Sequence, residues 1–148
     1  MTLRTHSAAE TRRAGIAFGQ RLLRVGPGSC ARVVALSGEL GAGKTTFVQG
    51  IVRGLGTRRR AASPTFIMIR AFPLKKPFRA VYHVDAYRVR HADEVRRMGF
   101  ATWRADPRII ILIEWPERLP RLLPADRIRV RFGHGRTENE RTIAIAYR

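Results

Sequence analysis

The sequence predicts an α/β fold in which helices flank a central, mostly parallel β-sheet and antiparallel strands lie at an edge. Short apolar runs, typical of buried strands, alternate with helical patterns along the chain. A glycine-rich stretch joins one of these strands directly to a helix. The chain has 148 residues without an internal repeat or an evident linker, so we expect residues 1–148 to form a single domain.

The first predicted element is a helix over residues 8–24. A capping-box pattern, Ser7 to Glu10, precedes apolar residues that recur every four positions, and a Gly-Pro-Gly sequence ends the pattern. A buried strand is predicted over 31–36, and a second helix over 46–53 follows the glycine-rich stretch. The order strand, glycines, helix is therefore the central feature of the amino-terminal half.

The carboxy-terminal half contains further short strand-like runs and one short helical pattern, over 93–98. The last two runs resemble a hairpin that closes one edge of the sheet. The predicted strands cover residues 65–72, 80–85, 108–114, 127–132 and 142–147.

The composition is that of a soluble globular protein, with a hydrophobic fraction of 45% and a charged fraction of 27%. The longest aliphatic run, Ile109 to Ile113, is far shorter than the roughly 18 residues of a membrane span. The amino-terminal segment lacks the apolar core of a secretory signal. The single cysteine, Cys30, excludes an internal disulfide and a multi-cysteine zinc site. We therefore expect a cytoplasmic protein.

The chain is strongly basic, with 29 basic and 11 acidic residues and a net charge of +18. This charge fits direct contact with RNA or another polyanion. It equally fits a compositional bias of the genome, because 26 of the basic residues are arginine and they are spread along the chain. Only residues 56–63 form a cluster, and no aromatic residue lies within it to stack on bases. The charge alone does not decide between these two interpretations.

Residues 38–45, GELGAGKT, fit the pattern G-x-x-x-x-G-K-[ST] of a phosphate-binding P-loop. Glycines allow successive backbone N–H groups to surround a phosphate, and the amino terminus of the following helix favours the same anion. Lys44 supplies a charge for the β- and γ-phosphates, and the Thr45 hydroxyl can coordinate Mg²⁺. The strand before and the helix after this motif predict a P-loop NTPase-like fold and a single P-loop ATPase domain.

A P-loop requires an acidic residue at the end of a neighbouring strand to hold Mg²⁺ and its waters. Two strand-like runs end in such a residue, Glu114 in IIILIEW and Asp85 in VYHVDAYR, and we expect both to face one metal. The only asparagine, Asn139, is not part of the N-K-x-D motif that reads guanine. ATP with Mg²⁺ is therefore the predicted cofactor pair.

An ordered series of motifs extends beyond the P-loop and covers residues 11–147. After GELGAGKTTF, the motifs are SPTF at 63–66, HVDAYR at 83–88, EVRRMGF at 94–100 and IEWPERL at 113–119. With these motifs in this order and spacing, the chain resembles the TsaE (YjeE) family, the bacterial ATPase of tRNA threonylcarbamoyladenosine synthesis.

The resemblance implies an ATPase that is slow alone and works with threonylcarbamoyl-transferase proteins, TsaD- and TsaB-like. Together they modify the adenosine next to the anticodon of tRNA, and ATP binding or hydrolysis regulates or resets the transferase partners. The tRNA is reached through the complex, and direct contact with this chain stays open. Arg88 and Arg136 are candidate arginine fingers within the chain, and a partner could supply one instead.

The resemblance also implies the roles of individual residues. Lys44, Glu114 and Asp85 are the expected catalytic residues, and Thr45, Glu114 and Asp85 the expected metal-site residues. Trp115 fits equally a place beside the nucleotide and a place in the core. The expected nucleotide-binding residues are Thr11, Gly38, Glu39, Leu40, Gly41, Ala42, Gly43, Lys44, Thr45, Thr46, Ser63, Thr65 and Arg136.

Two other functions remain as alternatives to this interpretation. A small P-loop kinase would use the same loop to phosphorylate a metabolite or nucleoside, with residues 56–63 as an arginine lid. A basic RNA-binding module with an accessory ATP site would bind RNA tightly on its own, and less tightly as salt is raised.

Overall fold

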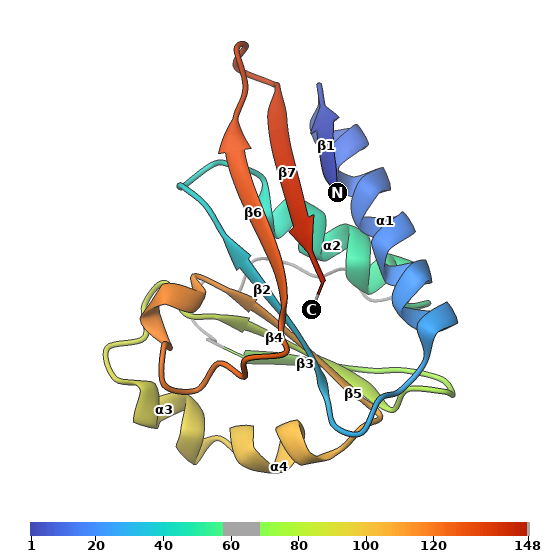
Figure 1. Cartoon of the computed structure of the whole chain (residues 1–148), viewed down its shortest axis with the longest axis vertical. Helices are drawn as coiled ribbons and strands as arrows, with labels where there is room; N and C mark the ends of the chain where they lie inside the picture. Colours follow the sequence, from blue (N-terminus) through green and yellow to red (C-terminus); the bar gives the residue numbers. More distant parts are fainter. Residues whose placement is uncertain (58–68, 148) are drawn as a thin grey trace.

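The computed structural model describes residues 1–57 and 69–147, and its centre is a seven-stranded sheet of order β1-β7-β6-β2-β5-β4-β3. Figure 1 shows the sheet with helices on both of its faces. The strands are β1 (Thr2–Thr5), β2 (Arg32–Ser37), β3 (Ile69–Pro73), β4 (Ala80–Asp85), β5 (Ile109–Glu114), β6 (Ile128–His134) and β7 (Arg141–Ala146).

The four middle strands, β6, β2, β5 and β4, are parallel, so the predicted α/β class is confirmed. Antiparallel strands lie at both edges of the sheet, whereas the sequence predicted them at one. At one edge β3 pairs with β4, and at the other β7 pairs with β6 and β1 pairs with β7. The predicted hairpin of the last two strands is present, but β1 covers its outer side and forms the edge.

Helices α1 (Ala8–Val25) and α2 (Lys44–Gly54) pack together on one face of the sheet, and the short helices α3 (Ala92–Arg97) and α4 (Phe100–Ala105) lie on the other (Figure 1). Ser7 caps α1 as predicted, because its hydroxyl accepts the Glu10 N–H at 3.1 Å. The predicted helix over 93–98 is α3. Helix α4 was not predicted and begins after Gly99, whose φ of 108° separates the two short helices.

Each face of the sheet has its own buried core. The core under α1 and α2 includes Phe18, Phe47, Leu36 and Leu112. The core under α3 and α4 includes Val95, Phe100, Ile111 and Ile113. Strand β5, which lies between β2 and β4, is buried along its whole length because it contributes to both cores. In the part of the chain that the structure describes, no helix is both long and apolar enough to cross a membrane.

Helices α1 and α2 approach each other through glycines spaced four residues apart, Gly15 and Gly19 on α1 and Gly50 and Gly54 on α2. A Cβ atom built on Gly50 would lie 2.3 Å from the carbonyl oxygen of Arg12, closer than real Cβ contacts. The same overlap with backbone occurs at the other three positions. This packing fixes the position of α2, whose first turn borders the glycine-rich stretch.

We therefore predict that Gly50→Ala destabilises the protein although alanine favours a helix. Overpacking of a tight contact costs about 1–3 kcal/mol, which exceeds the gain in helix propensity of about 1 kcal/mol. Urea unfolding measures the difference. Gly28→Ala is the matched control, because its Cβ would meet nothing nearer than 3.7 Å. Equal stability of Gly50→Ala and the wild type would contradict the close helix contact.

Candidate nucleotide-binding site

Residues 38–45 connect the carboxyl end of β2 to the amino terminus of α2, as the sequence predicted. Gly43 is the N-cap of α2 and has a φ of 96°, a conformation that side chains disfavour. Because Gly43 has no side chain to cap the helix, the first amide groups of α2 can bind an anion. Gly38 allows β6 to approach the loop, since a Cβ there would lie 2.7 Å from the Phe132 carbonyl oxygen.

Lys44 is the first residue of α2 and is only 5% exposed. Its ammonium group donates hydrogen bonds to the carbonyl oxygens of Gly38 at 2.7 Å and Glu39 at 2.8 Å. The same ammonium lies 3.9 Å from the centre of the Trp115 ring, a cation–π contact. Burial lowers the pKa of Lys44 below its ordinary value, and the nearby Glu114 carboxylate opposes this shift.

The two predicted acids lie side by side, because Asp85 and Glu114 are partners in the register of the parallel strands β4 and β5. Glu114 is 2% exposed, and its Oε2 accepts a hydrogen bond from the Thr45 hydroxyl at 2.9 Å. Asp85 is half-buried, and its Oδ1 accepts the Tyr87 backbone N–H at 3.1 Å. The structure thus brings the P-loop threonine and the two carboxylates to one place.

These groups border an open cleft of about 360 Å³ at the carboxyl edge of the sheet. Arg88, one of the candidate arginine fingers, also lines it. The lining residues are Leu40, Gly41, Gly43, Lys44, Thr45, Thr46, Asp85, Tyr87, Arg88, Glu114 and Trp115.

Trp115 follows β5 directly and has a φ of 59°; among residues 1–57 and 69–147 it is the only non-glycine residue with positive φ. Its N–H donates to the Leu36 carbonyl oxygen at 3.2 Å, which fixes this unfavourable backbone next to the P-loop strand. The centre of the Trp115 ring lies 5.0 Å from that of the Tyr87 ring, and the side chain packs against the core under α3 and α4. The Trp115 side chain therefore lies beside the cleft and also packs against the core, the two places that the sequence left open.

Some predicted nucleotide-binding residues do not line this cleft. Thr11 is buried, and its hydroxyl hydrogen-bonds with that of Thr5 at 2.8 Å. Its methyl group is near Gly43 of the P-loop. Arg136 is exposed in the β6–β7 turn, where its backbone N–H donates to Glu140 at 3.0 Å. Ala42 is buried in the core under α1 and α2. Ser63 and Thr65 lie outside the described residues.

A second hollow, of about 520 Å³, lies on the β6 side of the P-loop. Gly38 and Glu39 line it together with Ser37, Arg131, Phe132, Gly133 and His134. The P-loop therefore has an open space on each side, one bordered by the carboxylates of β4 and β5 and one by β6.

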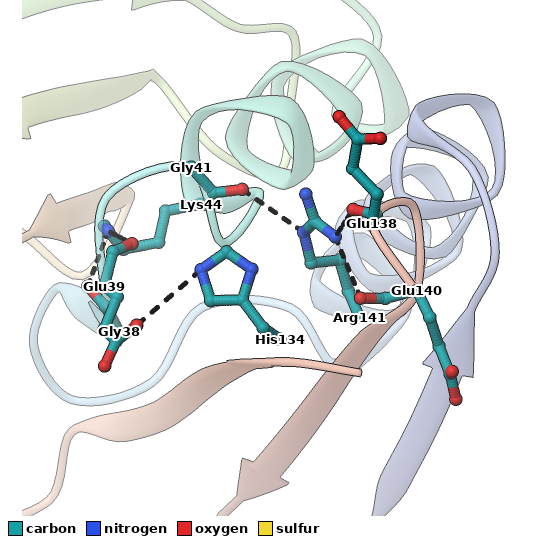
Figure 2. Close-up of polar contacts among 8 residues, drawn as sticks. All are labelled: Gly38, Glu39, Gly41, Lys44, His134, Glu138, Glu140 and Arg141. Carbon is teal, nitrogen blue, oxygen red and sulfur yellow. Dashed lines mark hydrogen bonds and ion pairs between the residues drawn. The ribbon is translucent and has the colours of Figure 1, made fainter. Parts of the chain in front are cut away.

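The β6–β7 hairpin contacts the outer side of the P-loop at two points (Figure 2). Arg141 donates to the Gly41 carbonyl oxygen at 3.2 Å and to the Glu140 carbonyl oxygen at 2.9 Å. His134, opposite Arg141 in the hairpin, lies 3.8 Å from a carboxylate oxygen of Glu39. The sequence analysis missed Arg141, because one more arginine in an arginine-rich chain gives no signal.

The sequence analysis also missed a role for His83, which is fully buried on β4 with its Nε2 2.8 Å from Oε1 of Glu114. In the sequence it is the first residue of the motif HVDAYR, two residues before Asp85, but the motif does not show that its imidazole contacts Glu114. Histidine is less often fully buried than an aliphatic residue, so a histidine in a strand of the core suggests a polar role.

The strand order, the P-loop after β2 and the carboxylate on the neighbouring parallel strand together define a P-loop NTPase-like fold.

Comparison with known proteins identifies the family within this class. The sequence model of "Threonylcarbamoyl adenosine biosynthesis protein TsaE" matches residues 5–143, and the chain belongs to the TsaE family. The resemblance drawn from the motifs is thereby confirmed, and the family is one of tRNA threonylcarbamoyladenosine biosynthesis.

Relatives of this name share more than a third of the aligned residues. The protein from Streptomyces coelicolor is 40% identical over 113 residues, which cover 76% of this chain and 72% of the relative. The protein from Synechocystis is 37% identical, over 71% of this chain and 66% of the relative. The crystal structure of YdiB from Bacillus subtilis superposes with a TM-score of 0.77 at 25% identity, covering 99% of this chain and 84% of that one.

The buried cation predicts a specific pH dependence of stability. Because the folded-state pKa of Lys44 lies below the ordinary 10.5, the unfolded chain binds more protons between these two values, and wild-type stability rises with pH there. We expect Lys44→Met to unfold at a higher temperature than the wild type at pH 7. This advantage should shrink as the pH approaches 10.5.

Thermal unfolding of the two proteins at several pH values measures this difference. Lys75→Met, at an exposed position, controls for the loss of one positive charge. A Lys44→Met variant that is less stable than the wild type at pH 7, or whose difference does not change with pH, would contradict the unfavourable burial.

Proposed function

We propose that this chain is the Mg²⁺-dependent, ATP-binding and ATP-hydrolysing subunit of the system that adds the threonylcarbamoyl group to the adenosine next to the anticodon of tRNA. ATP binding or hydrolysis regulates or resets the transferase partners, which are TsaD- and TsaB-like proteins, in the cytoplasm. Family membership supports the tRNA pathway. The observation that carries the nucleotide chemistry is the 2.9 Å hydrogen bond between Thr45 of the P-loop and the buried Glu114.

The residues of the cleft fit a nucleoside triphosphate. The backbone of residues 41–45 and the amino terminus of α2 would hold the phosphate oxygens. Lys44 would exchange its contacts with the Gly38 and Glu39 carbonyl oxygens and with Trp115 for contacts with phosphate oxygens. These present contacts hold the ammonium in the cleft, beside the site where the phosphates would bind.

The same residues fit a metal ion that is bound together with the phosphates. The Thr45 hydroxyl donates a hydrogen bond to Glu114, which leaves the lone pairs of the hydroxyl oxygen available to Mg²⁺. Glu114 and Asp85 would hold the waters of the ion. Among the residues described, no group of three or more histidine, cysteine or acidic side chains could hold a metal alone. This fits Mg²⁺, whose shell is usually completed by waters and substrate phosphates and which neutralises their charge.

The adenosine part of ATP would lie on the β6 side of the P-loop. The second hollow borders Gly38 and Glu39 there, and Arg136 follows two residues after its lining residue His134. Thr11 would act on the nucleotide through Gly43, to which its methyl group is near. The hydroxyls of Ser63 and Thr65 would sense the γ-phosphate. Arg88, which lines the cleft, is the proposed cis candidate for charge stabilisation, and a partner protein could supply another.

ATP turnover by the purified chain, alone and with TsaD- and TsaB-like proteins and unmodified tRNA, tests the proposal. We expect slow turnover alone, faster turnover in the complete system, and modified tRNA as a product. Transfer of the γ-phosphate to an added metabolite or nucleoside would indicate a kinase instead. Tight RNA binding by the chain alone, weakening steeply with salt and without any effect of the partners, would indicate an RNA-binding module.

Two substitutions separate phosphate binding from metal use. Lys44→Ala should abolish ATP turnover, because it removes the buried cation of the P-loop. Glu114→Ala should lower Mg²⁺-dependent turnover by about 10- to 100-fold, while nucleotide affinity changes less. Steady-state kinetics over a range of Mg²⁺ concentrations and a nucleotide-binding titration measure both effects. Glu138→Ala, an exposed glutamate, is the control. Wild-type turnover in Glu114→Ala would refute the metal assignment.

A further inference from the structure

His83 contacts the acidic residue of the site from within the sheet. On β4 it pairs in register with Leu112 of β5, so Glu114 is its diagonal neighbour two residues further along that strand. The His83 Nε2 atom lies 2.8 Å from Oε1 of Glu114, and both side chains are almost completely buried. Oε2 of Glu114 meets Thr45, so each carboxylate oxygen has its own partner.

The hydrogen-bond pattern fixes the tautomer of the imidazole ring. The Glu114 carboxylate accepts a hydrogen bond from Thr45, and as a carboxylate it can only accept from His83 as well, so Nε2 of His83 is the donor. The other nitrogen, Nδ1, is buried and has no hydrogen-bond partner in the described part of the chain. A proton on Nδ1 would be a buried donor without an acceptor, which is unfavourable. The hydrogen-bond pattern therefore favours the tautomer with its proton on Nε2.

Packing alone does not explain why position 83 carries a histidine. The partner positions on the same face, Val81 on β4 and Leu112 on β5, carry aliphatic side chains in the core under α1 and α2. An aliphatic residue at position 83 would continue this pattern without burying an unpartnered nitrogen. The single contact that distinguishes the imidazole from an aliphatic side chain is its hydrogen bond to Glu114.

We propose that His83 is a positioning residue, whose Nε2–H holds the Glu114 carboxylate in the orientation in which Oε2 meets the Thr45 hydroxyl. Without this donor, Oε1 would be a buried carboxylate oxygen lacking its partner, and the group would turn toward another donor. Thr45 would then lose the acceptor that orients its hydroxyl. The inference rests on the proposed function, because Thr45 and Glu114 form the proposed Mg²⁺ site.

Variants of His83 separate the hydrogen bond from packing. The amide nitrogen of His83→Gln reaches the position of Nε2 and can still donate to Glu114, whereas the shorter amide of His83→Asn reaches only the position of Nδ1. His83→Leu keeps apolar packing without a donor. Val81→Ala, two residues earlier on the same face and fully buried, removes core packing but leaves the hydrogen bond intact.

Steady-state ATP kinetics over a range of Mg²⁺ concentrations, with thermal unfolding of each variant, test the inference. We expect His83→Asn and His83→Leu to lower kcat by about 10- to 100-fold and to require more Mg²⁺, with KM for ATP changed much less. His83→Gln should recover most of kcat. Val81→Ala should unfold at a lower temperature and keep its kcat. Equal losses in His83→Gln and His83→Leu, or a comparable loss in Val81→Ala, would overturn the positioning role.

A spectroscopic measurement tests the inference independently of ATP turnover. Long-range ¹H–¹⁵N correlation spectra of the imidazole rings, with His83→Gln used to assign the signal, report which nitrogen carries the proton. We expect the Nε2–H form in the wild type. A proton on Nδ1 alone would overturn the inference even if the protein hydrolyses ATP. A wild type without ATP turnover but with the Nε2–H form would refute the proposed function while the contact to Glu114 stands.

Discussion

The parallel pairing of β2, β5 and β4 is the constraint on which the site depends, because it brings the carboxyl ends of three strands to one edge of the sheet. The register aligns Leu36 with Glu114, and Glu114 with Asp85. The P-loop begins two residues after Leu36, so its threonine can reach Glu114 across the strand boundary. A shift of one residue would turn the carboxylate to the opposite face, where α3 and α4 lie. The order of the strands thus determines which charged groups can meet.

This arrangement buries two charged side chains, Lys44 and Glu114, next to the imidazole of His83. All three residues are at most 5% exposed. Burial of a charge is costly unless partners compensate it, and here the partners are two backbone carbonyl oxygens, a hydroxyl, an imidazole and an aromatic ring. The surrounding cores, which bury β5 from both sides, support this unfavourable cluster. The burial of these groups therefore lowers the free energy of unfolding, while it fixes the geometry of the site.

The sequence predicted the parts of the fold that arise from local patterns. The strands β4, β5, β6 and β7 lie within about two residues of the predicted ranges, and the P-loop lies where the motif placed it. Strand β1 was missed because it has four residues and is stabilised by pairing with β7 at the other end of the chain. Helix α4 was missed because Gly99 divides one helical pattern into two short helices. Arg141 belongs to no motif, and His83 begins the motif HVDAYR, but nothing in the sequence shows that either residue meets Gly41 or Glu114, because these contacts arise only when distant strands come together.

The phosphate loop is held from both sides, and this explains why the site residues come from so many elements. On the β6 side, Arg141 donates a hydrogen bond to the Gly41 carbonyl oxygen (Figure 2). Thr11 packs near Gly43, and its hydroxyl hydrogen-bonds with that of Thr5 in the edge strand β1. On the other side, Thr45 binds Glu114, which His83 holds in turn. The loop is short and rich in glycine, so it gains little rigidity from its own side chains. Its shape is therefore set by the two ends of the chain on one side and by the parallel strands on the other. A P-loop motif alone supplies the amides and the lysine, whereas the orientation of the threonine and the carboxylate depends on the whole sheet.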